Sequence, residues 1–153
     1  WGYMLDHGAT TLWETWAYSD NVFSQNHPMF GSINEWFYRS VLGINPAAPG
    51  FKEIVIKPRI AEGLTWAFGH YDSIHGRIRS SWKVDEEVFY LDVEIPVNTT
   101  AEIWLPKKHG EIARENGLMI NVSKRILDTR AEANHRVARV GSGKYSFQVS
   151  SQH

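Results

Sequence analysis

The chain has 153 residues, with 16 Lys or Arg against 17 Asp or Glu, so its formal net charge is −1. A chain this close to neutral is not expected to be a general nucleic-acid binder. No stretch approaches the roughly 18 apolar residues that a membrane-spanning helix needs, so no membrane partner is expected. The sequence contains no Cys, which excludes disulfides, thiol nucleophiles and Cys-ligated zinc and leaves localisation open.

Apolar residues make up 42% of the chain and the mean hydropathy is −0.36, values typical of a globular protein with a core of its own. The chain begins with Trp1 and no initiator Met, which suggests a segment of something longer. Half of the aromatic residues precede position 40. The proline-rich run from Asn45 to Gly50 then predicts a break through which neither a helix nor a sheet ladder passes. We therefore expect a domain boundary between residues 48 and 49.

Residues 1–48 carry two signals for helices. A capping box at Ser32-Ile33-Asn34-Glu35, followed by an apolar stripe, predicts a helix over residues 32–43 that ends at Gly43. A second capping box at Thr11-Leu12-Trp13-Glu14 favours a shorter helical piece there. So few helices cannot cover so many large aromatic side chains, and further protein is expected to pack against them.

Residues 49–153 change to a period of two, which is typical of strands with one buried face. Alternation is clear over 54–56, 78–84, 89–95, 101–105 and 145–149, with turn residues at roughly ten-residue intervals. We interpret residues 107–116 as a polar loop. The pattern over residues 118–140 predicts no particular element. The second domain is therefore predicted to be an antiparallel β-sandwich, and the fold class to be α+β.

Few residues suggest chemistry from their pattern alone. No HExxH pair, GxSxG, GxGxxG or P-loop motif is present, so no metal and no cofactor are expected. Glu14 lies between Trp13 and Trp16, and His27 follows in the segment from Asn26 to Ser32. Indole faces stack on sugars, and partial desolvation favours a carboxylate able to take a proton from water. Glu14 is equally explained as the third residue of a capping box, the two tryptophans as a core stripe, and His27 as a buried hydrogen-bonding residue.

The sequence resembles the bacterial α-L-rhamnosidases at these residues. The resemblance rests on Trp1 to Met4, Gly8 to Trp16, Asn26 to Ser32, Glu35 to Arg39, and motifs beyond the proposed boundary. Those motifs are Pro49-Gly50-Phe51, Ile54 to Pro58, Gly63-Leu64, Ser73 to Gly76, Trp82 and Ile95 to Ala101, and the resemblance then thins toward Ser142 to Phe147.

The resemblance implies that residues 1–48 are the last helices of an (α/α)6 catalytic barrel and that residues 49–153 are the C-terminal β-sandwich domain. It implies inverting hydrolysis of terminal α-L-rhamnosides, with Glu14 as the general base, His27 contacting the sugar, and Trp13 or Trp16 walling the pocket. No residue of the chain fits the general acid, so the rest of the barrel is expected to supply it and the chain alone to be inactive. The chain departs from the family pattern in two places: Thr15 stands where many relatives have Arg, and the connection from Trp16 to Asn26 is short. Both departures affect the rim of the pocket, so the aglycone preference stays open.

Two other functions remain compatible with the sequence. The β-sandwich could be a non-catalytic carbohydrate-binding module, with Trp66, Trp82 and Trp104 lining a sugar-binding face. Alternatively, the chain could belong to an (α/α)6 glycosidase that acts on another sugar.

Overall fold

The computed structural model describes residues 1–16, 24–107 and 112–151. The chain divides into two compact units, residues 1–37 and 38–153, and each is described by itself. The domain boundary expected between residues 48 and 49 stays a prediction. No helix among the described residues is long and apolar enough to span a membrane.

The first unit contains short helices. Helix α1 spans Gly2–Asp6, the 3₁₀ turn η1 spans Pro28–Ser32, and α2 spans Ile33–Trp36. The helical backbone continues as the π-helical turn η2, Phe37–Val41, and stops before Gly43, whose φ is +75°. The helix expected over 32–43 is therefore present, starting four residues earlier and ending two residues earlier.

The capping box predicted at Ser32 is wrong. Ser32 has helical dihedrals and makes no capping hydrogen bond through its side chain. The helical run begins at Pro28 instead, and His27 is its cap, with Nδ1 accepting a hydrogen bond from the backbone N–H of Met29 at 3.2 Å. Proline at the first helical position lacks the N–H that would go unpaired there, which favours this earlier start.

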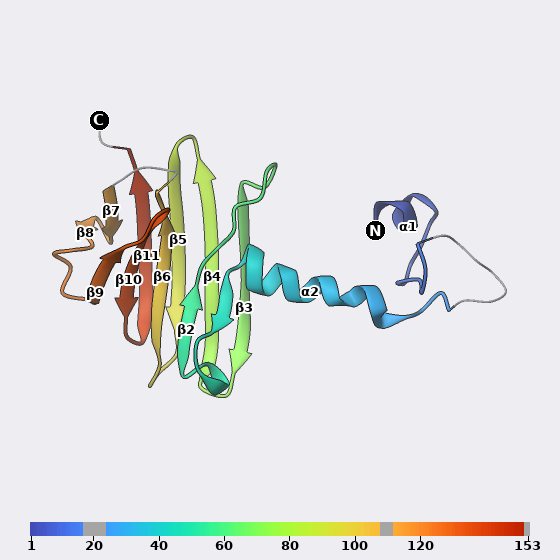
Figure 1. Cartoon of the computed structure of the whole chain (residues 1–153), viewed down its shortest axis with the longest axis horizontal. Coiled ribbons are helices and arrows are strands. Elements are labelled where there is room, and N and C mark those ends of the chain that lie inside the picture. Colours follow the sequence, from blue (N-terminus) through green and yellow to red (C-terminus); the bar gives the residue numbers. More distant parts are fainter. Residues whose placement is uncertain (17–23, 108–111, 152–153) are drawn as a thin grey trace. The chain divides into compact units, whose positions relative to one another are not determined.

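The second unit is a β-sandwich of two sheets (Figure 1). The five-stranded sheet has the order β1-β2-β6-β10-β9, with bounds Ile44–Pro46, Glu53–Ile56, Thr100–Pro106, His135–Val140 and Ile126–Ala131. The six-stranded sheet has the order β3-β4-β5-β11-β7-β8, with bounds Trp66–Ser73, Gly76–Asp85, Val88–Ile95, Gly143–Ser150, Ile112–Glu115 and Leu118–Met119. A 3₁₀ turn, η3, covers Pro49–Phe51.

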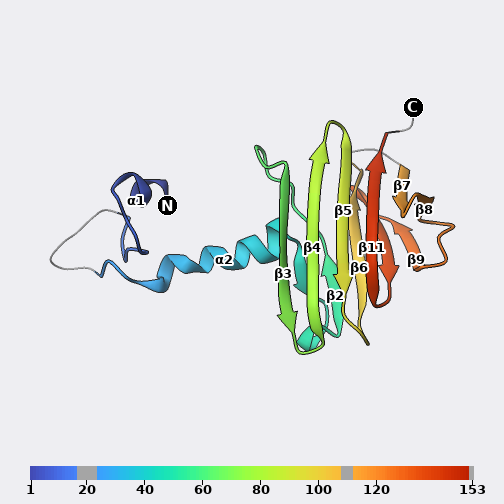
Figure 2. The same ribbon diagram turned by 180° about the vertical axis from the view of Figure 1, so that it is seen from behind.

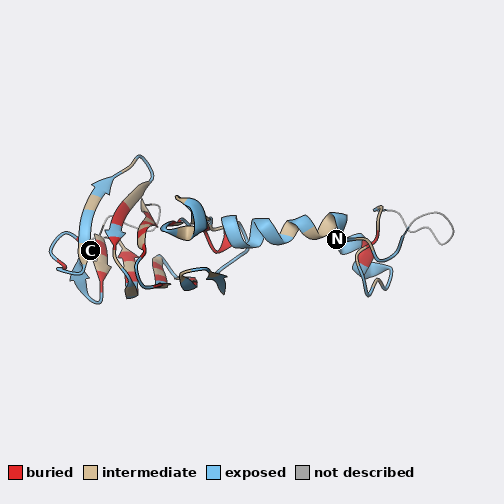
Figure 3. Ribbon diagram, turned by 90° about the horizontal axis from the view of Figure 1, so that it is seen from below, coloured by how far each residue is buried: buried red, intermediate tan, exposed pale blue. Residues whose placement is uncertain are grey.

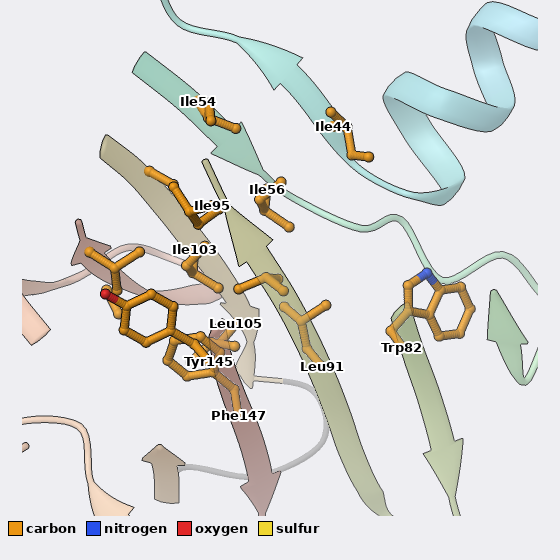
Figure 4. Packing of buried hydrophobic residues seen from close by; sticks show 14 of the residues in the cluster. Ile44, Ile54, Ile56, Trp82, Leu91, Ile95, Ile103, Leu105, Tyr145 and Phe147 are labelled. Carbon is orange, nitrogen blue, oxygen red and sulfur yellow. The ribbon is translucent and has the colours of Figure 1, made fainter. Parts of the chain in front are cut away.

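All neighbouring strands pair antiparallel except β2 and β6, which are parallel. The antiparallel sandwich predicted from the period of two is therefore confirmed, with this one parallel pair inside it. The inward residues of both sheets form one core, and Figure 3 shows the buried residues along the strands. Figure 4 shows core side chains from both sheets, among them Ile56, Ile103, Leu91 and Phe147.

Two expectations about loops are wrong. A sheet ladder does enter the proline-rich run, because β1 includes Pro46 opposite Ile54. Since β1 is an edge strand, its proline needs no ladder donor on the open side. The stretch 107–116 is not simply a polar loop, because it contains β7; residues 108–111 of it lie outside the described part.

Strand β7 also carries a buried carboxylate. Glu115 is 1% exposed and receives hydrogen bonds from Ser123 Oγ at 2.9 Å, Asn116 Nδ2 at 2.8 Å and Arg125 Nη1 at 2.7 Å. A buried charge is tolerated only when it is paired and its lone pairs are satisfied. This network therefore ties the 116–125 segment to the end of the six-stranded sheet.

Candidate functional site

The predicted site residues lie on two segments of the first unit, 11–16 and 24–30, which run antiparallel without forming a regular strand pair. The backbone N–H of Glu14 donates to the carbonyl oxygen of Ser24 at 2.9 Å, and that of His27 donates to the carbonyl oxygen of Leu12 at 2.7 Å. Thr11 Oγ1 donates to the carbonyl oxygen of Gln25. These bonds bring the segments of Glu14 and His27 together and join residues 10 to 15 positions apart in the sequence.

The carboxylate of Glu14 has a fixed orientation. Its Oε2 accepts a hydrogen bond from the backbone N–H of Ser24 at 2.9 Å, so Glu14 and Ser24 are joined by two reciprocal bonds. The side chain is partly exposed. Residues 11–14 are not helical, so the capping-box interpretation of Thr11 and Glu14 is wrong. The Ser24 donor was missed because nothing in the sequence marks a backbone N–H ten residues away.

The two tryptophans beside Glu14 have different surroundings. Trp13 is 5% exposed and lies edge-on to Tyr3, with ring centroids 6.5 Å apart. Trp16 is 48% exposed, stacks on Phe30 at 4.1 Å and meets Trp1 edge-on at 5.3 Å. They do not form one core stripe, because only Trp13 is buried.

His27 is partly buried and has a structural role at the start of η1, since its Nδ1 accepts from Met29 N–H. That hydrogen bond requires Nδ1 to be unprotonated, which in the neutral ring puts the proton on Nε2. The imidazole therefore has one nitrogen that orients the ring and a second that is a potential donor to a ligand hydroxyl. His27 forms a hydrogen bond as expected but is only partly buried, and this bond does not conflict with a role in binding.

The surface proposed for a carbohydrate-binding module is not formed by the three predicted tryptophans. Trp82 is 2% exposed and its Nε1 donates to the carbonyl oxygen of Val41 at 2.8 Å, so its assignment to a surface is wrong. Trp104 is half-buried on the five-stranded sheet, with Lys57 Nζ 3.9 Å from its ring centroid and Arg130 at 5.5 Å. Trp66 lies on the other sheet, and it alone of the three is well exposed.

No group of three or more His, Asp or Glu side chains in the described part of the chain is arranged to hold a metal ion.

Two family models match the chain in sequence order. Residues 1–41 match the bacterial alpha-L-rhamnosidase 6 hairpin glycosidase domain, and residues 43–118 match the bacterial alpha-L-rhamnosidase C-terminal domain. The chain belongs to the bacterial α-L-rhamnosidase family. The first of these matches contains Glu14, Trp13, Trp16 and His27, and the second covers the first six strands of the sandwich together with β7 and Leu118 of β8.

Curated α-L-rhamnosidases are similar to the chain over almost its whole length. The protein from Streptomyces avermitilis is 35% identical over 158 residues, which cover 97% of this chain and 14% of the relative. The relative from Formosa agariphila is 33% identical and that from Alteromonas sp. is 36% identical, covering 97% of this chain and 17% and 16% of theirs. The chain thus spans about one-sixth of the length of these relatives.

Solved structures agree with this relationship. The α-L-rhamnosidase from Dictyoglumus thermophilum has a TM-score of 0.87 and 35% identity, covering 96% of this chain and 17% of that one. The Streptomyces avermitilis α-L-rhamnosidase complexed with L-rhamnose has a TM-score of 0.86 and 34% identity, covering 98% and 15%. Residues 17–23, most of the connection from Trp16 to Asn26 that was expected to be short, lie outside the described part of the rhamnosidase chain.

Proposed function

We propose that this chain is part of an enzyme that releases terminal α-L-rhamnose by inverting hydrolysis, and that Glu14 is its general base. The observation that carries the proposal is the orientation of the Glu14 carboxylate by the Ser24 N–H, within the residues that match the glycosidase domain. In an inverting mechanism one carboxylate takes a proton from water while an acid on the other side of the sugar protonates the leaving oxygen, about 6.5 to 9.5 Å away. A carboxylate fixed through one oxygen keeps the other aimed at the water, which avoids reorientation during the reaction.

The neighbouring side chains support a sugar site around this base. We assign Trp16 and His27 to direct contacts with the rhamnose, because Trp16 presents an exposed, stacked indole and His27 has a ring fixed by Met29 N–H. Trp13, being buried, is assigned to the pocket wall behind Glu14. Apolar ring faces favour the C–H faces of a sugar, and an imidazole N–H favours a hydroxyl.

The general acid and most of the pocket are proposed to come from the remainder of the catalytic barrel. This chain corresponds to only 14–17% of the relatives' length, and exposed aromatic residues of its first unit, such as Trp1 and Tyr3, are surfaces for that remainder to cover. The partners of the chain are then a rhamnose-containing glycoside and the rest of the barrel. The chain by itself is expected not to turn over substrate.

The test compares Glu14→Gln with the wild type in the longer protein, using an aryl α-L-rhamnoside. Glutamine keeps an oxygen that can accept from Ser24 N–H but cannot take a proton from water, so kcat should fall by about a hundredfold or more while Tm is unchanged. Glu62→Gln, an exposed carboxylate of the second unit, is the matched control for loss of charge. Unaltered turnover in Glu14→Gln contradicts the assignment of Glu14 as the general base. Steady hydrolysis by the 153-residue chain contradicts the proposal that the remainder of the barrel supplies the general acid.

A panel of other aryl glycosides tests the sugar. Preference for a pyranoside other than α-L-rhamnoside would favour the alternative of a related (α/α)6 glycosidase with another substrate.

A further inference from the structure

The outer face of the six-stranded sheet carries two rows of side chains that cross four strands. Each row has one residue from each of β3, β4, β5 and β11, and each residue is paired with the next. The first row is Trp66, Lys83, Tyr90 and Gln148. The second row is Phe68, Ser81, Asp92 and Ser146. Because directly paired residues project from the same face of a sheet, all eight side chains share one surface about 15 Å across. Figure 2 shows these four strands side by side.

The edge of this surface is an exposed aromatic pair. Trp66 is 60% exposed and Phe68 is 63% exposed, although both belong to a regular strand. Their rings are stacked, with centroids 5.9 Å apart and planes inclined by 16°. Two nearly parallel, well exposed rings on neighbouring outward positions of β3 form one apolar patch, which we call the platform.

The platform lines one side of a hollow of about 480 Å³, and most of the other residues that line it are polar. Its lining includes Arg79, Tyr90, Asp92 and Gln148. Two of the wall groups are held in place, since Ser146 Oγ donates to Asp92 Oδ1 at 2.6 Å and Lys83 Nζ lies 4.7 Å from the centroid of the Tyr90 ring. The apolar platform thus lies beside fixed hydrogen-bonding groups.

We propose that this face, with Trp66 and Phe68 as its platform, is a non-catalytic binding site for a neutral pyranose chain bearing rhamnose. The ligand identity rests on the proposed function. A pyranose has an apolar C–H face and a rim of hydroxyls, which match the ring platform and the Asp92, Gln148 and Arg79 wall. The 6-methyl group of a deoxyhexose adds apolar area for the rings to cover.

A carbohydrate fits the surface better than a protein partner does. Specific protein interfaces have an apolar core that charged residues avoid, over about 800 Å² on each partner. Here the exposed apolar part is two rings wide, Lys83 is paired with Trp66, and Arg79 and Asp92 line the same hollow. The three charged side chains that line the hollow sum to only +1, so no strong field there selects a charged ligand.

The experiment titrates the 153-residue chain with a rhamnan oligosaccharide and follows the ¹H–¹⁵N spectrum, including the indole N–H of Trp66. We expect saturable shifts at Trp66, Phe68 and Tyr90 with a Kd on the order of 1 mM, as for a weak, solvent-exposed site. Trp66→Ala and Phe68→Ala should each weaken binding by about fivefold or more. Leu127→Ala is the control, because Leu127 is 62% exposed but lies on β9 of the other sheet.

The absence of shifts with rhamnan up to about 20 mM overturns the proposal. The proposal is also overturned if the shifts persist in Trp66→Ala and Phe68→Ala, or if Leu127→Ala abolishes them equally. Self-association of the chain that Trp66→Ala removes would overturn it as well. Binding is measured here without catalysis. Loss of the platform's binding therefore leaves the role of Glu14 intact, and unaltered turnover in Glu14→Gln leaves the platform intact.

Discussion

The indole N–H of Trp82, on β4, donates to the carbonyl oxygen of Val41 at the end of the helical segment, at 2.8 Å. The neighbouring carbonyl of Leu42 accepts from Ser80 Oγ, also at 2.8 Å and also buried. The last carbonyls of a helix have no partner within the helix. Two inward side chains of the sandwich therefore complete the end of this helix, which fixes residues 41–42 on the core.

Trp82→Phe is expected to destabilise the chain by about 1–3 kcal/mol, because the Val41 carbonyl then stays buried without a donor. Urea unfolding followed by circular dichroism measures the change. Trp66→Phe is the control, since it replaces an exposed indole and should change stability by less than about 0.5 kcal/mol. Equal effects of the two substitutions would show that the Trp82 hydrogen bond is unimportant.

Gly43→Ala is expected to be among the most damaging small substitutions in the chain. Gly43 has a φ of +75°, and a Cβ there would lie 2.2 Å from the backbone carbonyl carbon of Lys57. Gly63 has a φ of +81° with nothing within 4 Å of an added Cβ, so Gly63→Ala measures the conformational strain alone. Unfolding experiments should give a loss for Gly43→Ala that exceeds that for Gly63→Ala by more than about 2 kcal/mol. Similar losses would mean that the backbone at Lys57 can move aside.

His135 is expected to make stability fall in mild acid. Burial lowers its pKa below the ordinary 6.5, Lys57 and Lys107 lower it further, and Glu132 opposes them. The unfolded chain therefore binds the proton more readily than the folded chain. The contribution of neutral His135 to the free energy of unfolding is complete above pH 6.5 and decreases as pH falls toward the lowered pKa. His135→Gln should flatten this part of the profile when urea unfolding is measured from about pH 7.5 to about pH 5. An unchanged slope would contradict the assignment to His135.

The strands that were predicted correctly share one property, which is strict alternation with the apolar set facing the core. β4, β5, β6 and β11 all follow it. β3 was missed because Trp66 and Phe68 face outward while Ala67 and Gly69 face inward, the reverse of the usual pattern. The mismatch marks the surface to which we assign binding. β9 and β10 were missed because charged residues interrupt their pattern, and only the pairing of β10 with β6 and of β9 with β10 makes strands of them.

Both predicted capping boxes failed for a local physical reason. A side chain caps a helix only if no stronger partner is available, and at Thr11 and Glu14 other contacts took precedence. Thr11 Oγ1 bonds the Gln25 carbonyl and Glu14 bonds Ser24 N–H, so that segment pairs with 24–30 instead of coiling. At Ser32 the helical turn had already begun at Pro28, with His27 as its cap.

The sequence by itself determined the family, the change from helical to two-residue periodicity and most of the sandwich core, because these depend on local patterns and motifs that survive in the linear chain. It also identified Glu14 and His27 as a candidate pair. Only the tertiary structure decided which groups face each of them, that Trp82 is buried while Trp66 is exposed, and that Glu115 is a buried charge. Those outcomes depend on contacts between residues far apart in the chain, and a one-dimensional pattern does not specify which distant donor or ring will fill a given position.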